Sequence, residues 1–397
     1  MFSGVSIIIP TYNGGSLFHR CLEKIKSQDY VGEIQLVVID SGSTDGTPEI
    51  AENSGAVVKR IKQENFNHSR TRNEALALAV HDKVVFMVQD AIPVANNWFT
   101  SLVSSLEQEQ IAAAYVQQVP HDDADIYARY EVESHNEYLG KEPVVQSINS
   151  AEAFAKLSYD EALRLVRFDN VCAIYRKHLL EKNPFPDIEF AEDMAWAHSM
   201  ILQGYKILFQ PQIVVSHSHN RTPEYRFRRA IADSRACAQI LGVVRDDLSC
   251  FNSKDLRALH KSIQAYAESF QNESSAGEET RDNTNTFIQT LTKMVWCIPV
   301  SRKNMVSILN RLAPARIKKK VMYEAVEQAL KQHISFTISM LIKRYQLTSK
   351  HEILKCIKQI SSSTVGRIYG EVYASYLLKG NVPDEIEGLV RPYMDGV

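Results

Sequence analysis

The chain has 397 residues, of which 45% are apolar and 23% are charged. This composition excludes a largely disordered or low-complexity chain, and the length predicts a globular protein of two domains. Its 45 basic and 47 acidic residues leave a net charge of -2, which excludes a general electrostatic attraction to nucleic acid. We therefore expect no nucleic-acid partner.

The first part of the chain alternates short β-branched runs with amphipathic helical patterns. The runs expected to form strands are Val5–Ile9, Ile34–Ile39, Ala56–Ile61, Val84–Val88 and Ile111–Val116. Their nearly continuous apolar character is typical of strands that are covered on both faces. The alternation with helices predicts a doubly wound, mostly parallel α/β sheet of the Rossmann-like kind, whose ligands bind at the carboxyl ends of the strands.

The same pattern continues further along the chain. We expect strands at Val171–Tyr175 and Ile207–Val215, a helix from about Met194 to Gln203, and a long helix from Pro223. The polar stretch before these elements, residues 121–167, has few clear signals, and we expect it to shape one side of the ligand site.

Beyond Gly242 the strand signals stop and helical periodicity takes over. We place the domain boundary near residues 243–252, and therefore expect an α/β domain over residues 1–245 and a C-terminal helical domain over residues 253–397. The helical region carries no chemistry that the sequence identifies. Packing, dimerisation, docking to a partner and docking to a membrane all stay open as its role.

No segment of the sequence predicts secretion or insertion into a membrane. Met1 leads almost directly into Val5–Ile9 without a basic region or a cleavage site, which predicts a cytoplasmic protein. Apolar stretches such as Ile334–Ile342 fall short of the ~20 residues that a spanning helix requires. Peripheral attachment to the inner face of the cell membrane stays open, because one basic cluster fits either anionic headgroups or a solvated helix face. This cluster comprises Arg311, Arg316, Lys318, Lys319 and Lys320.

Small and polar residues follow the first two expected strands. Pro10-Thr11-Tyr12-Asn13 directly follows the first strand, and Asp40-Ser41-Gly42-Ser43-Thr44-Asp45 directly follows the second. A carboxylate such as Asp40 can accept the N3–H of a uracil or thymine base, while Asp45 can contact the ribose or cap the next helix. Ordinary turns and helix caps favour the same residue types. The first loop lacks G-x-G-x-x-G, which argues against a dinucleotide-binding Rossmann site.

Together, P-T-Y-N and V-V-I-D-S-G-S-T-D-G-T resemble the family-2 glycosyltransferases, which are inverting enzymes of the A-type glycosyltransferase fold. The resemblance covers roughly residues 5 to 240. It implies a nucleotide-diphosphate sugar as donor. It also implies that a nucleoside pocket is lined by Pro10, Tyr12, Asp40, Ser41 and Asp45.

The segment F-N-H-S-R-T-R-N places His68, Arg70 and Arg72 near the start of a helix. Such a position suits a diphosphate, although exposed charges at a helix start also explain the arginines. This segment resembles the rhamnosyltransferase branch of the family, and the resemblance implies a deoxythymidine-diphosphate rhamnose (dTDP-rhamnose) donor.

Gln89 and Asp90 follow the fourth expected strand, where the family usually carries an Asp-x-Asp motif that holds a divalent metal, magnesium or manganese. Only Asp90 is a carboxylate here, and Q-D-A-x-P resembles the same rhamnosyltransferase branch. An aspartate that ends a strand without binding a metal is the alternative. His217 and His219 share one face of a strand end, so they can complete a metal site with Asp90 or donate to the leaving diphosphate. A pair of histidines at a strand end without a ligand is the alternative.

Glu192 and Asp193 lie in the first turn of an expected helix, where acidic residues also suit the helix dipole. Inverting sugar transfer requires a base that accepts the proton of the acceptor hydroxyl. The family's E-D motif implies Asp193 as that base. Glu192 would position the acceptor or orient the loop.

The resemblance as a whole implies an inverting glycosyltransferase that moves L-rhamnose to a saccharide or lipid-linked saccharide of a bacterial surface polysaccharide such as O-antigen. A uridine-diphosphate hexose or N-acetylhexosamine donor is the first alternative. A nucleotide-binding scaffold without activity is the second, since the Asp-x-Asp motif is incomplete. Self-association into a homo-oligomer stays open.

Overall fold

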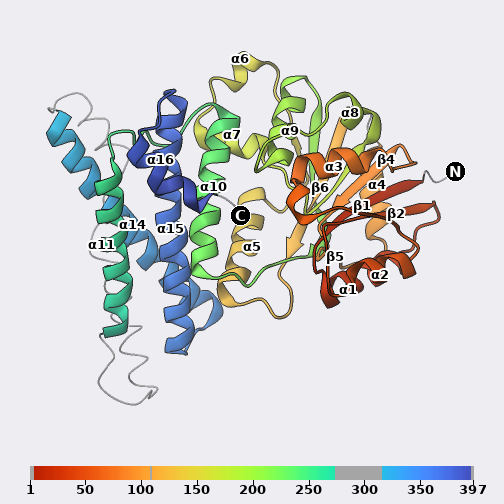
Figure 1. The fold of residues 1–397 in the computed structure, drawn as a ribbon, viewed down its shortest axis with the longest axis horizontal. Coiled ribbons are helices and arrows are strands. Elements are labelled where there is room, and N and C mark those ends of the chain that lie inside the picture. Colours follow the sequence, from red (N-terminus) through yellow and green to blue (C-terminus); the bar gives the residue numbers. More distant parts are fainter. Residues whose placement is uncertain (1–3, 108–109, 273–314, 395–397) are drawn as a thin grey trace. The chain divides into compact units, whose positions relative to one another are not determined.

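The computed structural model describes residues 4–107, 110–272 and 315–394 (Figure 1). The chain divides into two compact units. The first comprises Met1–Ala124 and Glu131–His219, and the second comprises Asp125–Tyr130 and Asn220–Val397.

One nine-stranded sheet forms the centre of the first unit within the described residues. Its strands are β1 (Val5–Thr11), β2 (Ile34–Asp40), β3 (Val57–Arg60), β4 (Lys83–Met87), β5 (Ile92–Pro93), β6 (Ile111–Val119), β7 (Val144–Gln146), β8 (Cys172–Arg176) and β9 (Lys206–Ser216). They follow the order β3-β2-β1-β4-β8-β6-β9-β5, and β7 pairs with β9. Because β8 is antiparallel to both β4 and β6, the strands β1 to β4, β6 and β9 run in one direction. The expected doubly wound, mostly parallel α/β sheet is confirmed.

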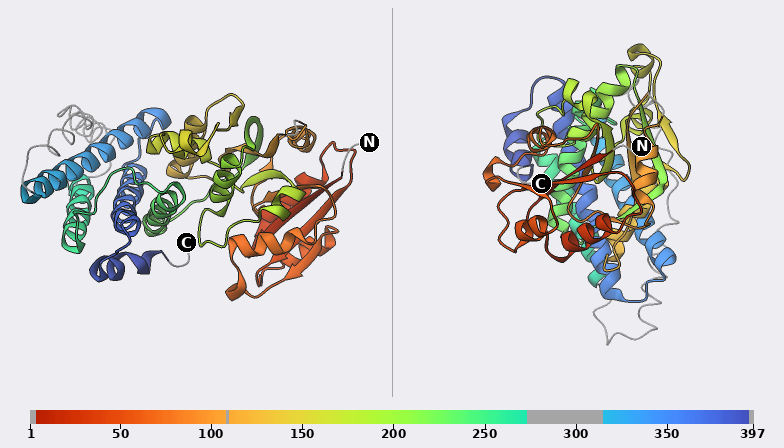
Figure 2. Two further views of the ribbon diagram at one scale, coloured as in Figure 1. Left: turned by 90° about the horizontal axis from the view of Figure 1, so that it is seen from above. Right: turned by 90° about the vertical axis from the view of Figure 1, so that its right-hand side faces the viewer.

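Helices of the first unit cover both faces of the sheet (Figure 2). They are α1 (Gly15–Lys26), α2 (Thr47–Asn53), α3 (His68–Leu76), α4 (Trp98–Ser104), α6 (Ala151–Phe154), α7 (Tyr159–Val166), α8 (Lys177–Lys182) and α9 (Glu192–Leu202). Side chains of β1 alternate between two cores, as strand geometry requires. Ile7 and Ile9 pack with Phe18 of α1, whereas Ile8 packs with Trp196 of α9. This two-sided burial explains the apolar strand sequences.

The expected strands are all present, with ends that differ by a few residues. The polar stretch 121–167, in which the sequence shows few signals, contains α5 (Ile126–Leu139), β7, α6 and α7. Its helix starts are local in origin: Ser158 and Glu161 form a capping box at the start of α7. The β7 strand joins the sheet edge by pairing with β9, and that pairing is a tertiary contact that periodicity cannot reveal.

The described part of the second unit is helical. It contains α10 (Pro223–Leu241), α11 (Ser253–Asn272), α14 (Ala315–Tyr345), α15 (Lys350–Leu378) and α16 (Asp384–Val390). The division between the units falls after His219 rather than near residues 243–252. The reason is that α10 packs lengthwise along α15, and this contact assigns α10 to the helical unit.

Two glycines of α15 allow this close contact. A Cβ atom at Gly366 would lie 2.2 Å from the carbonyl oxygen of Phe227, and one at Gly370 would lie 2.7 Å from that of Ile231. Both partner atoms belong to the backbone of α10 and cannot move aside as a flexible side chain would. The two helices therefore pack backbone against backbone at these positions.

The basic cluster expected to face a membrane or solvent is only partly described. Arg311 lies outside the described residues, and Arg316 to Lys320 lie in α14. Lys319 forms a 2.6 Å ion pair with Asp255, and Lys320 lies 3.8 Å from Glu324. Among the described helices, none is both long enough and apolar enough to cross a membrane. The peripheral membrane contact stays a prediction.

We expect Gly366→Ala to destabilise the helical unit. The added methyl group forces α10 and α15 apart, and such overpacking costs about 1–3 kcal/mol in the free energy of unfolding. Gly388→Ala in α16 is the matched control, because a Cβ atom there meets nothing within 4 Å. Urea unfolding followed by circular dichroism measures both variants. Equal midpoints for the two variants would contradict the close packing of α10 on α15.

Candidate active site

The candidate residues from the sequence lie together at one end of the strands in the sheet of the first unit. In the pairing register, Thr11 of β1 lies opposite Asp40 of β2, and Val119 of β6 lies opposite Ser216 of β9. The antiparallel β8 begins at the same edge, because Cys172 pairs with Met87 at the end of β4. The loops that follow β1, β2, β4, β6 and β9 thus meet the loop that precedes β8, at the carboxyl ends where ligands of α/β sheets bind.

Asp40 is buried, and its carboxylate organises the loop that follows β2. Its oxygens accept hydrogen bonds from the Thr11 hydroxyl at 3.1 Å, from the backbone N–H groups of Gly42 and Ser43 at 3.0 Å, and from the Ser43 hydroxyl. A carboxylate offers about four acceptor positions, and these bonds use them. In this structure Asp40 holds the loop shape. Its contact with a base stays a prediction.

The loops after β1 and β2 are joined by further hydrogen bonds. Asp45 is exposed, accepts from the backbone N–H of Gly15 at 3.0 Å, and also accepts from the Thr47 hydroxyl at 2.6 Å. The hydrogen bond from Thr47 is the main reason why the pKa of Asp45 lies below its usual value. Ser41 is buried and donates its hydroxyl hydrogen to the Thr11 carbonyl. The expected nucleoside loops therefore form one connected surface.

Tyr12 and Gln89 connect the first loop to the end of β4. The Gln89 side chain accepts from the Tyr12 N–H at 2.9 Å and donates to the Tyr12 carbonyl at 3.1 Å. Tyr12 is 42% exposed, so its ring is accessible to a ligand, whereas Pro10 is half-buried. Gln89 thus supports the loop through its backbone.

Arg72 and Glu192 form a buried ion pair. The Arg72 Nη1 atom lies 2.6 Å from Glu192 Oε1, and both side chains are less than a tenth exposed. His68 Nδ1 lies 3.2 Å from the same guanidinium. Burial by itself raises the pKa of Glu192, but the charges of Arg72 and His68 outweigh it, and the pKa is lowered. Glu192 is therefore an ionised, fixed group.

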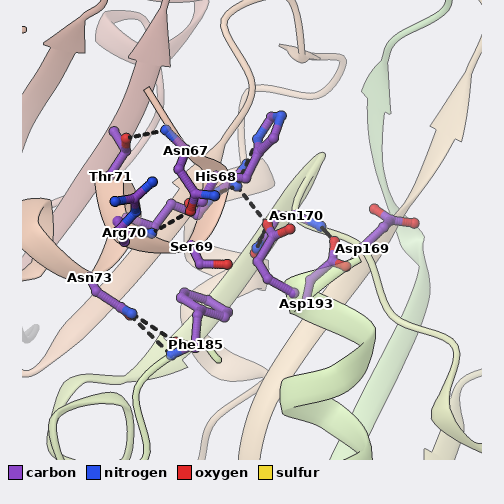
Figure 3. Close-up of polar contacts among 12 residues, drawn as sticks. Asn67, His68, Ser69, Arg70, Thr71, Asn73, Asp169, Asn170, Phe185 and Asp193 are labelled. Atoms are coloured by element: carbon purple, nitrogen blue, oxygen red, sulfur yellow. Dashed lines mark hydrogen bonds and ion pairs between the residues drawn. The ribbon is translucent and has the colours of Figure 1, made fainter. Parts of the chain in front are cut away.

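The three basic residues of α3 are placed differently. Arg72 was expected to contact a diphosphate, and here it is buried against Glu192. Arg70 is exposed and lies 3.6 Å from the exposed Asp187, and His68 is also exposed. Asn67 caps the helix by accepting from the Arg70 N–H at 3.0 Å, which fixes the position of this segment (Figure 3).

Asp193 is half-buried at the start of α9 and lies beside Asn170, as Figure 3 shows. Its Oδ2 atom accepts from the Asn170 N–H at 2.8 Å. Burial, together with the nearby carboxylates of Glu192 and Asp169, raises the pKa of Asp193 to about 7. The preceding Ala191 has φ 62° and ψ 39°, a left-handed conformation that is strained for alanine and common at functional sites. The geometry thus presents one carboxylate whose proton is exchangeable at neutral pH.

Asp90, His217 and His219 come together as a group that can hold a metal ion. His217 Nε2 lies 3.8 Å from Asp90 Oδ1, and His219 Nδ1 lies 3.5 Å from Asp90 Oδ2. The pairing of β6 with β9 is irregular a few residues before His217. Val116 pairs with Gln210, whereas the next residue, Gln117, pairs with Val214. Irregularities of this kind change the direction in which the following side chains point.

Three residues of the site do not emerge from the sequence analysis. Asn170 contacts both acidic residues, because its side chain also donates to Glu192 at 3.4 Å. Asp169 raises the pKa of Asp193 and lies 3.5 Å from His135. Gln118 contacts both His217 and Asp169. Their one sequence signal is their position. Asp169 and Asn170 precede the expected strand Val171–Tyr175, which is antiparallel in the structure, and Gln118 lies two residues beyond the expected strand Ile111–Val116.

Comparisons with known proteins point to sugar transfer. The family profile described as "Glycosyl transferase family 2" matches residues 6–182. The O-antigen chain rhamnosyltransferases RfbN of Salmonella typhimurium and WbaN of Salmonella anatum are 36% identical over 229 and 232 residues, covering 57% and 56% of this chain and 69% of each relative. A solved structure of mannosyltransferase PcManGT from Pyrobaculum calidifontis, in complex with GDP-Man and Mn2+, is similar with a TM-score of 0.43 and 20% identity over 84% of this chain and 87% of that chain.

Because the pKa of Asp193 is raised, we expect the stability of Asp193→Asn relative to wild type to increase with pH. The folded protein keeps this proton up to about pH 7, whereas the usual value is 3.8, so the stabilising contribution is present at low pH and lost as pH rises. Asp193→Asn removes the titration. We expect its melting temperature, relative to wild type, to increase from about pH 4 to about pH 8.

Thermal unfolding at a series of pH values measures this difference. Asp82→Asn is the matched control, because Asp82 is exposed and precedes β4 at the opposite edge of the sheet. A difference between Asp193→Asn and wild type that does not change with pH contradicts the raised pKa.

Proposed function

This chain belongs to glycosyltransferase family 2, and we propose that it is an inverting enzyme that transfers L-rhamnose from dTDP-rhamnose to a saccharide. The family and the α/β sheet of the A-type fold establish a glycosyltransferase. The choice of rhamnose is supported by the likeness to the two O-antigen chain rhamnosyltransferases. The observation that carries the catalytic part is the contrast between Glu192, which is fixed by Arg72, and Asp193, whose pKa is raised.

Asp193 is the proposed base. As the acceptor hydroxyl attacks the anomeric carbon, its proton passes to the Asp193 carboxylate while the bond to the donor diphosphate breaks on the opposite face. A base works best when its pKa lies near the working pH, and a pKa of about 7 meets this condition. Glu192 stays ionised beside it, held by Arg72, and helps to keep that pKa high.

The donor would lie over the loops that follow β1, β2 and β4. Tyr12 offers an exposed ring and Asp45 an exposed carboxylate for the nucleoside. His68 and Arg70 are exposed at the start of α3, so these two, rather than the buried Arg72, suit the diphosphate. The pair between Arg70 and Asp187 is a surface pair, and such pairs exchange partners at little cost.

Asp90, His217 and His219 are the proposed metal ligands. Two imidazoles and one carboxylate suit a first-row divalent ion such as Mn2+ better than Mg2+, which prefers oxygen donors throughout. A bound divalent ion would offset the charge that develops on the leaving diphosphate. His217 and His219 follow β9 and Asp90 follows β4, so the site joins the segments after two strands.

The proposed acceptor is a saccharide or lipid-linked saccharide of a bacterial surface polysaccharide of the O-antigen kind. This part is supported by the likeness to the two rhamnosyltransferases. The part of the site near Asp193 also contains Asn170, Asp169 and His135. Their polar side chains suit the hydroxyl groups of a sugar. A homo-oligomer stays a prediction.

We expect Asp193→Asn to abolish transfer while leaving donor binding intact. Loss of a general base lowers kcat by about 10²–10⁴-fold, because nothing accepts the proton of the acceptor hydroxyl. For wild type, kcat/KM should fall below about pH 7, where Asp193 is protonated. Rhamnose transfer from dTDP-rhamnose to a panel of short bacterial oligosaccharides measures both effects, with Asp82→Asn as control.

Uridine-diphosphate glucose and uridine-diphosphate N-acetylglucosamine belong in the same assay. Turnover of a uridine donor without turnover of dTDP-rhamnose would show that the proposed donor is wrong. Full activity of Asp193→Asn would show that the proposed base is wrong. Donor binding without any turnover, with every donor and acceptor tried, favours a nucleotide-binding scaffold.

We expect EDTA to stop transfer and Mn2+ to restore it. His217→Ala and His219→Ala should each weaken Mn2+ binding, measured by calorimetry, because each removes one of three proposed ligands. His178→Ala is the matched control, since His178 is exposed in α8. Transfer that continues at full rate in EDTA contradicts a metal requirement.

A further inference from the structure

Gln118 connects the proposed metal ligands to the carboxylates around the base. It lies at the end of β6, is 9% exposed, and pairs in register with Val215 of β9. Its Oε1 atom lies 2.8 Å from His217 Nδ1, and its Nε2 atom donates to Asp169 Oδ2 at 3.3 Å. One buried amide thus contacts both a proposed metal ligand, His217, and a carboxylate beside the proposed base, Asp169.

The carboxylate of Asp169 determines which way the amide of Gln118 faces. An ionised carboxylate only accepts hydrogen bonds, so the NH2 group of Gln118 must face Asp169. The backbone N–H of Val171 donates to the other oxygen of Asp169 at 3.3 Å, and His135 lies 3.5 Å from Oδ2, which holds the carboxylate in place. The carbonyl oxygen of Gln118 therefore faces His217.

The carbonyl oxygen of Gln118 in turn determines the tautomer of His217. Because this oxygen only accepts, the Nδ1 atom of His217 must carry the proton. In a neutral imidazole the lone pair is then on Nε2, the atom that faces Asp90 at 3.8 Å. Metal-binding histidines are commonly oriented in this way through their second nitrogen.

We propose that Gln118 is a positioning residue that holds His217 as the Nδ1–H tautomer, with its Nε2 lone pair directed to a divalent cation bound by Asp90 and His219. The proposal rests on the metal site of the proposed function. Asp169 acts through Gln118, so a carboxylate beside the base also orients a ligand of the cation.

Mn2+ affinity tests the role of Gln118 directly. Calorimetric titration of Gln118→Leu should show binding weakened by about 10–100-fold, the usual effect of removing such a partner. Gln117→Leu is the matched control, because alternation along β6 places Gln117 on the opposite face of the sheet. Equal affinity of Gln118→Leu and Gln117→Leu would overturn the proposal.

The tautomer can be measured without any metal. Nitrogen NMR of metal-free protein labelled at histidine, recorded near pH 8, should show His217 with its proton on Nδ1, assigned by loss of its signals in His217→Ala. Asp169→Asn should produce a mixture of tautomers, because an amide at position 169 accepts or donates and no longer fixes the Gln118 amide. An Nε2–H tautomer in wild type would overturn the proposal. The tautomer can be measured even if wild type binds no Mn2+. Absence of Mn2+ binding would contradict the proposed metal site, whereas the tautomer tests the role of Gln118.

Discussion

The ion pair between Arg72 and Glu192 joins the beginnings of two helices that are 120 residues apart in the sequence. Arg72 lies in the second turn of α3 and Glu192 is the first residue of α9, so one 2.6 Å contact fixes both helix starts against each other. Asp193 follows Glu192 directly, and its position depends on this contact. A buried pair of this kind is costly to break, because either partner alone would be an uncompensated buried charge.

The pair also decides which of two neighbouring carboxylates keeps a proton. Glu192 has the guanidinium of Arg72, so it stays ionised, and its negative charge then raises the pKa of Asp193. Asp169 adds to the same effect. Two adjacent acidic residues with opposite pKa shifts are typical of a site that needs one fixed charge and one exchangeable proton.

Much of the fold could be predicted from the sequence, because buried strands carry local apolar runs and the strand-end loops carry local motifs. The partners within the site could not be. Arg70 and Arg72 are about 200° apart around a helix, so only one of them can face a ligand, but the sequence does not say which. Glu192 selects Arg72 as its partner. Gln118 belongs to no motif, and its contacts with His217 and Asp169 depend on the pairing of β6 with β9.

The single carboxylate at the end of β4 follows from the hydrogen bonds of Gln89. This side chain both accepts from the N–H of Tyr12 and donates to its carbonyl, and a carboxylate could only accept. An aspartate here would therefore lose one of the two bonds that hold the first loop. The remaining ligands of the proposed site come instead from His217 and His219, which are uncharged when they bind a metal. With neutral imidazoles around Asp90, the site carries less negative charge than a pair of carboxylates would, and this favours the approach of a diphosphate.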